Sequence, residues 1–324
     1  MAARSEGPFG EVSIPPVRIL DPYAVPGQFK KAQLHVHTTR SDGQLEPEEA
    51  LARYRDAGYT FVCLTDHDRV TRCEALNGPG FLAVPGVEET LVRGIYPLGP
   101  HLTRLLVDRP MPKGTAQERL DATRREGGVA VLNHPSWKGN FWTGGWTMGV
   151  MRRLRGPFLV EIVNPHSDTA EDVRRWAALL RERPRSEAVG AVASDDAHTP
   201  LQIHRAWIMV KVEDVTAEAF RRALATLAFY ATTGPEVDLG AADGVVRCAG
   251  TTLRQVAFID RQGRVRAEED GPEALYRPAG DEEFVRVEAH DGSGGRIWSQ
   301  PFWLEPDEAE AGGAKVDEAE AGGA

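Results

Sequence analysis

The chain has 324 residues, 41% of them hydrophobic and 27% charged, which suits one large α/β domain with a smaller companion. No run of about 18 apolar residues is present, which excludes a membrane-spanning helix, and without an apolar signal segment the chain is expected in the cytoplasm. The formal net charge is −10, but residues 307–324 contain six acids and one lysine and carry half of it, so the mildly acidic body disfavours a nucleic-acid partner.

After an expected N-terminal extension over residues 1–28, short apolar runs alternate with amphipathic stretches. The runs predict strands at 32–37, 60–68, 81–88, 101–107, 128–135, 158–166, 188–198 and 206–212. Capping residues and closing glycines predict helices at 46–58, 115–128, 167–183 and 215–227. Seven or eight such units predict parallel βα repeats and a closed or nearly closed barrel over residues 29–234, with an open doubly wound sheet as the alternative.

Beyond the barrel region the pattern changes. Residues 235–305 read as short strands joined by glycine and aspartate turns, with no helix of useful length, and predict a small antiparallel β domain. Residues 306–324 repeat "DEAEAGGA" and contain almost nothing that could be buried, so they predict a disordered acidic tail.

Histidines and carboxylates gather at the ends of the predicted strands. His35 and His37 alternate within "QLHVHTTRSDGQ", so in an extended strand both imidazoles point to one face. Because the carboxyl ends of parallel barrel strands open on one face, residues at the other strand ends would converge with them. These residues are Asp66, His67, Glu88, His101, His134, Asp196 and His198. Six of the nine histidines therefore share one predicted location.

Bound metal explains this crowding best, because ionisable groups packed at one mouth would otherwise repel one another or lose hydration. The cysteines, Cys63, Cys73 and Cys248, form no CxxC pair, and donors limited to nitrogen and oxygen favour Zn, Mn or Fe. The candidate ligands exceed what one ion can accept, so two or three divalent ions are expected. Multinuclear sites of this kind usually catalyse hydrolysis.

The ordered motifs "HVHTTRSDG", "LTDHD", "PGVEET", "HLTRLL", "LNHP" and "SDDAH" resemble those of the PHP (polymerase and histidinol phosphatase) family of metal-dependent hydrolases, over about residues 31–206. The later "LAFYATTGPEVD" and "FVRVEAHDGSGGRIWSQPFWL" further resemble the CehA/McbA-like branch, in which a PHP barrel carries a C-terminal β domain. The resemblance implies a distorted (β/α)7 TIM-like barrel with a trinuclear metal centre.

The resemblance also implies how nine ligands are shared. The first metal would be held by His35, His37, Glu88 and Asp196. The second would be held by Asp42, His67 and His198, with Asp42 standing where some members carry a histidine. Glu88 would bridge to a third metal completed by His101 and His134; with His101 misaligned, the site would fall to two metals.

The function expected first is hydrolysis of a small phosphate ester by a metal-bridging hydroxide. Glu88, Asp196 and His198 would act within the cluster, and His166 would give acid help. The positively charged side chains expected to bind the phosphate are Arg40, Arg69, Lys138 and Arg205.

Two other functions are weighed against it. The CehA/McbA resemblance implies hydrolysis of a carbamate, carboxylic ester or amide. The segment "SWKGNFWTGGWTMG" offers Trp137, Trp142 and Trp146 as a wall for an aryl ester group, with Trp142 as the substrate-binding candidate. A non-catalytic scaffold is the third possibility, since some polymerase-attached PHP modules resemble the fold without its ligands. The complete ligand set argues against a scaffold, and the sequence leaves the oligomeric state open.

Overall fold

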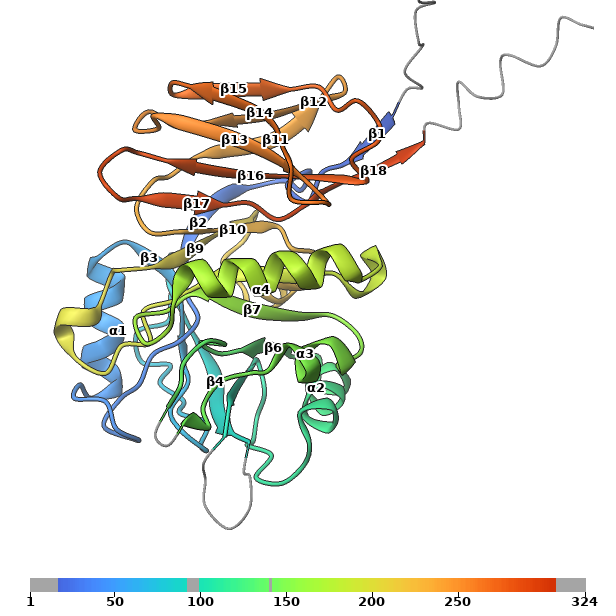
Figure 1. Cartoon of the computed structure of the whole chain (residues 1–324). Coiled ribbons are helices and arrows are strands. Elements are labelled where there is room, and N and C mark those ends of the chain that lie inside the picture. Colours follow the sequence, from blue (N-terminus) through green and yellow to red (C-terminus); the bar gives the residue numbers. More distant parts are fainter. Residues whose placement is uncertain (1–16, 92–98, 140–141, 307–324) are drawn as a thin grey trace, which may run out of the picture.

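The computed structural model describes residues 17–91, 99–139 and 142–306 (Figure 1). The predicted acidic tail after Pro306 and most of the predicted N-terminal extension lie outside the described residues. Within the described ranges, no helix is long and apolar enough to cross a membrane.

The helices are α1 (Pro47–Asp56), α2 (Ala116–Arg125), α3 (Met148–Arg153), α4 (Thr169–Glu182) and α5 (Ala217–Ala225). Four of them lie within predicted ranges, and their starts follow the expected capping chemistry. Thr115 caps α2 in a capping box, because its hydroxyl accepts from the Glu118 N–H while the Glu118 carboxylate accepts from the Thr115 N–H. The prediction missed α3, whose six residues are too few to show a helical period.

The first ten strands are β1 (Val17–Leu20), β2 (Gln28–Gln33), β3 (Tyr59–Leu64), β4 (Leu82–Thr90), β5 (His101–Leu105), β6 (Val129–Leu132), β7 (Phe158–Val163), β8 (Val189–Ala193), β9 (Trp207–Val212) and β10 (Phe229–Thr232). The remaining strands are β11 (Asp238–Ala242), β12 (Val245–Ala249), β13 (Gln255–Asp260), β14 (Val265–Asp270), β15 (Glu273–Tyr276), β16 (Phe284–His290), β17 (Arg296–Trp298) and β18 (Phe302–Pro306).

Strands β2 to β8 lie side by side in chain order and make a mixed sheet. The pairs β2–β3, β3–β4, β6–β7 and β7–β8 are parallel, as predicted. β5 is antiparallel to both β4 and β6, so the prediction of uniformly parallel units is wrong there. The reason is chain length, because residues 91–100 are too few for the crossover connection that a parallel partner needs.

The predicted closed barrel is not found as a continuous hydrogen-bonded ladder. β9 pairs antiparallel with β2 from Gln28 to Ala32 and so occupies the edge that β8 would need for closure. Beyond β2 the chain meets the segment after β8, where Val36 and Ala197 form an isolated parallel bridge and the His37 N–H donates to the Ala197 carbonyl at 3.0 Å. Among the described residues, the backbone of the two ends therefore meets at Val36, His37 and Ala197.

The C-terminal strands are antiparallel, as predicted, and β13, β14, β16, β17 and β18 continue the same sheet. β10 pairs with β17, and β1 pairs with β18, so residues 17–20 of the expected extension belong to this layer. Figure 1 shows these strands stacked above the α/β part, with α4 lying beside β7. β11, β12 and β15 form a separate three-stranded sheet. The boundary at residue 235 stays a prediction.

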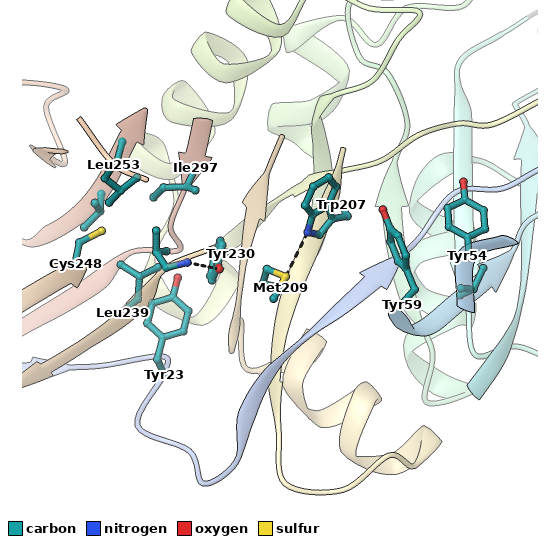
Figure 2. Packing of buried hydrophobic residues seen from close by; sticks show 14 of the residues in the cluster. Tyr23, Tyr54, Tyr59, Trp207, Met209, Tyr230, Leu239, Cys248, Leu253 and Ile297 are labelled. Carbon is teal, nitrogen blue, oxygen red and sulfur yellow. Dashed lines mark hydrogen bonds between the residues drawn. The ribbon is translucent and has the colours of Figure 1, made fainter. Parts of the chain in front are cut away.

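One hydrophobic cluster is shared by both parts of the molecule. Figure 2 shows Tyr54, Tyr59 and Trp207 from the α/β part in a row with Tyr230 and the C-terminal Cys248. The Tyr230 hydroxyl accepts from the Val237 N–H at 2.8 Å. This common core fixes the C-terminal layer against the strands that carry the candidate site.

Candidate metal centre

The histidine motif begins where β2 ends, and Gln33 holds it in place. The buried Gln33 side-chain carbonyl accepts from the N–H groups of Leu34 and His35 at 3.0 and 3.3 Å, and from that of Asp195 at 3.2 Å. One amide oxygen therefore joins the segment that carries His35 to the segment that carries Asp196.

Four side-chain atoms meet in the first group. The Nε2 atoms of His35 and His37 lie 3.0 Å apart. Glu88 Oε2 is 3.2 and 3.1 Å from them, and Asp196 Oδ1 is 3.3 and 3.2 Å from them. All four side chains are buried, and they are the four predicted to hold the first metal.

Glu88 is the centre of the cluster, because its two oxygens face different imidazoles. In addition to the first group, Oε2 lies 3.3 Å from His67 Nδ1. The other oxygen, Oε1, lies 2.9 Å from His101 Nδ1 and 3.2 Å from His134 Nε2. A carboxylate in this position has the geometry of a bridging ligand.

A second group lies on the more exposed side of the cluster, around Asp42. The Asp42 carboxylate is 3.5 Å from His37 Nδ1, 3.7 Å from His67 Nε2 and 3.4 Å from His198 Nε2. The structure therefore brings all nine predicted ligands together, and their role as ligands stays a prediction.

Two further groups of ligand atoms differ from the predicted assignment of residues to the three metals. Ligand atoms of His67, Glu88 and His101 lie within 4.8 Å of one another, so this group contains His67 where the prediction has His134. His166, Asp196 and His198 form another such group, with His166 Nε2 3.9 Å from Asp196 Oδ2. His166, predicted to give acid help, is thus placed where it could also be a ligand.

The histidines and the carboxylates of the first group shift each other's pKa values in opposite directions. Burial works to lower the pKa of His35, but the carboxylates of Asp196, Glu88 and Glu161 outweigh it and raise that pKa well above its usual value. Burial likewise opposes the hydrogen bonds to Asp196 and Glu88 that raise the pKa of His37 to about 9. Although burial would raise the pKa values of Glu88 and Asp196, the nearby histidines hold them well below the usual range.

Several features fit bound cations. His67 Nδ1 is buried and makes no hydrogen bond, although it lies 3.3 Å from a carboxylate oxygen. His134 and Asp196 have positive φ angles of 29° and 44°, a strained backbone that is common at functional sites. Nitrogen and carboxylate donors without sulfur suit Zn, Mn or Fe, so the residues present accept the expected metals.

Buried side chains outside the predicted ligand set orient the cluster. Glu161 Oε1 accepts from His35 Nδ1 at 2.7 Å, and Glu161 Oε2 accepts from the His134 N–H at 2.8 Å. Asn133 Nδ2 donates to Glu88 Oε1 at 3.0 Å. The sequence offered a signal for both, because Glu161 lies on a predicted strand and Asn133 directly precedes His134, yet neither was assigned a role.

Replacing Glu161 by glutamine is expected to weaken metal binding by about 10- to 100-fold, because the carboxylate fixes which nitrogen of His35 faces the cluster. Isothermal titration with Zn or Mn would measure the change. Glu171→Gln, on the surface of α4, is the matched control and should bind metal normally. Unchanged affinity in the Glu161 variant would show that His35 needs no such partner.

A cavity of about 490 Å³ opens on the cluster. Its lining includes Glu88, His101, Asp196 and His198, together with Trp137. The Trp137 ring lies 5.1 Å from the His101 ring and 4.8 Å from the His134 ring, between centroids. Of the three tryptophans that the sequence offers as a wall, Trp137 is in the described lining of the cavity, and Trp142 and Trp146 are not.

None of the five predicted substrate-binding residues is in the lining of this cavity. Among the described residues, the lining contains no lysine or arginine. Trp142 is 77% exposed, and Lys138 lies over its ring. Arg69 donates to the Arg40 carbonyl, and Arg205 donates to the Leu201 carbonyl. Their substrate-binding role stays a prediction that the cavity does not support.

No protein-family model matches the chain. Among curated proteins, a 5'-3' exoribonuclease from Haemophilus influenzae is 34% identical to it over 104 residues. The match covers 30% of this chain and 36% of that protein, so the chain spans about a third of that relative's length.

Three solved structures resemble the chain. A two-domain protein from Bacteroides vulgatus, described as containing a PHP-like metal-dependent phosphoesterase, has 15% identity and a TM-score of 0.47, with 88% of this chain and 93% of that one covered. An amidohydrolase from Chromobacterium violaceum has 15% identity and a TM-score of 0.36, covering 52% and 88%. A protein from Bifidobacterium adolescentis, described as a metal-dependent phosphoesterase, has 14% identity and a TM-score of 0.38, covering 60% and 96%.

Proposed function

We propose that this protein is a metal-dependent hydrolase of the PHP family that cleaves small phosphate esters with two or three divalent cations. The observation that carries the proposal is the position of Glu88, whose two oxygens face separate sets of imidazoles. A buried carboxylate shared in this way is suited to joining metal positions, and the ordered sequence motifs supply the family.

The chain's own residues define where the cations would bind. His35, His37, Glu88 and Asp196 surround the first position. Asp42, His67 and His198 surround the second, and Glu88 with His101 and either His67 or His134 would complete a third. Divalent cations there would acidify a water molecule and neutralise charge on the substrate oxygens.

His166 lies at the edge of this arrangement and is 39% exposed. Burial lowers its pKa, and the charges of nearby histidines lower it further, against the raising effect of Asp196. The imidazole is therefore neutral near pH 7. A neutral imidazole fits a ligand or a proton acceptor better than the proton donor that the sequence suggested.

The cavity favours a compact substrate whose negative charge is met by metal. About 490 Å³ suits a small molecule, and the described lining offers a phosphate no cationic side chain. A phosphate monoester suits several cations, because more than one of its oxygens can be neutralised at once.

A test of the proposal compares an aryl phosphate with the matching aryl acetate and aryl carbamate, using chelated protein to which Mn or Zn is restored. The phosphate is expected to be hydrolysed fastest, and inorganic phosphate is expected to inhibit competitively. Single-stranded RNA belongs in the panel because of the partial match to an exoribonuclease. Faster turnover of the carbamate, with no inhibition by phosphate, would contradict the phosphoesterase proposal.

The second candidate is hydrolysis of an aryl carbamate, ester or amide at the same cluster. Trp137 favours it, because its ring borders the cavity beside His101 and His134 and offers an apolar face to an aryl group. The absence of lysine and arginine from the described lining is also compatible with an uncharged substrate. Membership of the CehA/McbA-like branch would fit this function and stays a prediction.

Metal affinity is expected to rise with pH up to about 9. The pKa of His37 is raised to about 9, so below that pH a metal must displace a proton from its ring. In metal-free protein the folding stability changes with pH in the opposite direction. The stability gained from protonated His37 is complete below pH about 6.5 and is lost as the pH rises through 9. Metal titrations at pH 6.5, about 7.5 and about 9 would check the rise in affinity, and urea unfolding of metal-free protein at the same pH values would check the fall in stability. An affinity that does not change with pH would contradict this prediction.

A further inference from the structure

A second cavity, of about 530 Å³, lies away from the metal cluster at the opposite ends of the central strands. Val129 and Phe158, the first residues of β6 and β7, line it, whereas His134 of the cluster follows the other end of β6. Pro301 and Trp303 of the C-terminal part also line it. The cavity therefore lies where the α/β part meets the C-terminal strands, a common place for ligand sites.

The walls of this cavity are largely apolar. Phe158 and Leu159 contribute from β7, Leu224 and Ala225 from the end of α5, and Trp303 from β18. Its volume lies within the range of about 300–1,000 Å³ that small-molecule sites occupy. Such walls favour a ligand with an apolar body.

The charged groups in the lining are mostly positive, although the whole chain carries a net charge of −10. The lining contains Arg124, Arg185 and Arg221 against one acid, Asp21. Both Asp21 oxygens accept backbone N–H groups, from Tyr23 at 2.7 Å and Ala241 at 2.9 Å. The three guanidinium groups are therefore the dominant charges available to a ligand.

Each of these arginines has an acidic partner that the carboxylate of a ligand could displace. Arg124 pairs with Asp121, Arg221 with Glu218, and Arg185 Nη2 lies 3.3 Å from Glu305 Oε1. The six side chains are between 34% and 58% exposed, so these ion pairs are weak. A ligand carboxylate can make the same hydrogen bonds to a guanidinium as these side chains do, and burial of its apolar body in the cavity would add the free energy that favours it over them.

We propose that this cavity binds a small amphipathic carboxylate, whose carboxylate pairs with one or more of the lining arginines Arg124, Arg185 and Arg221. An apolar body of about ten carbon atoms would lie against Phe158, Leu224 and Trp303, in keeping with the cavity volume. This site is separate from the metal cluster and does not depend on the hydrolase function proposed above.

Isothermal titration of decanoate into the full-length, metal-loaded protein tests the proposal. Ala225→Trp would fill the cavity mouth from an exposed position of α5, and it is expected to weaken decanoate binding at least about tenfold. Ala217→Trp is the matched control, because Ala217 is exposed on the same helix and does not line the cavity. It should bind decanoate as the unaltered protein does.

A second variant tests the charge. Arg185→Gln combined with Arg221→Gln is expected to weaken decanoate binding at least about fivefold and to leave the weaker binding of uncharged decanol unchanged. The proposal is overturned if decanoate shows no saturable binding, if Ala225→Trp binds it normally, or if decanol binds as tightly as decanoate. Loss of the binding on metal chelation would place the carboxylate at the metal cluster and would also overturn it.

Discussion

Replacing Glu88 by glutamine is expected to remove at least one metal ion per chain and to lower turnover by about 10³-fold or more. Glu88 lies within 3.3 Å of five imidazoles, with three at one oxygen and two at the other. Glutamine keeps the shape but replaces one of these oxygens with an amide nitrogen that cannot bind a cation. Glutamine in place of Glu88 therefore cannot join two metal positions, because only one of its two terminal side-chain atoms can bind a cation.

The matched control for Glu88 is its neighbour on β4. Because successive side chains of a strand point to opposite faces, Glu89 is directed away from the cluster, where it pairs with Arg104 and Arg119. Glu89→Gln should keep its metal, as measured by elemental analysis after gel filtration. A Glu88 variant with full metal content and full activity would show that the cluster is wrongly assigned.

Truncating Glu89 to alanine is expected to lower the free energy of unfolding by about 3–5 kcal/mol, because it removes a buried carboxylate that pairs with two buried guanidinium groups. Glu89 is fully buried, and its carboxylate lies 3.2 Å from Arg104 Nη1 and 2.6 Å from Arg119 Nη1. Both arginine side chains are almost completely buried as well.

Urea unfolding monitored by circular dichroism would measure this loss in metal-free protein. Glu126→Ala is the control, since Glu126 also pairs with Arg104 but is 34% exposed, and it should cost only about 1 kcal/mol or less. A loss below about 1 kcal/mol for the Glu89 variant would mean that the two arginines find other partners or water.

The ligand cluster could be predicted from the sequence because its chemistry is local. His35 and His37 lie two residues apart in an extended segment, and the other candidates follow apolar runs whose ends meet in space. The sequence pattern alone marked Glu88 and Asp196 as strand-end residues without saying which oxygen faces which imidazole. Those contacts depend on the tertiary structure.

Other features depend on the arrangement of the chain and were beyond sequence reasoning. The antiparallel β5 follows from the short connection after β4, and the open edge of β2 is taken by β9, which lies far along the chain. The sequence offers Trp137, Trp142 and Trp146 alike as a cavity wall, yet the structure exposes Trp142, buries Trp146 and places Trp137 beside the histidines. Neighbouring tryptophans in one segment cannot be distinguished without the path of the backbone.

The central claim is that one cluster holds several metal ions, and metal content per chain tests it most directly. Elemental analysis of the purified full-length protein, loaded with excess Zn or Mn and then passed through gel filtration, is expected to give at least two divalent ions per chain, because separate ligand groups meet at Glu88. A value near zero or one, with the fold intact by circular dichroism, would contradict the multinuclear centre and the hydrolase mechanism proposed from it.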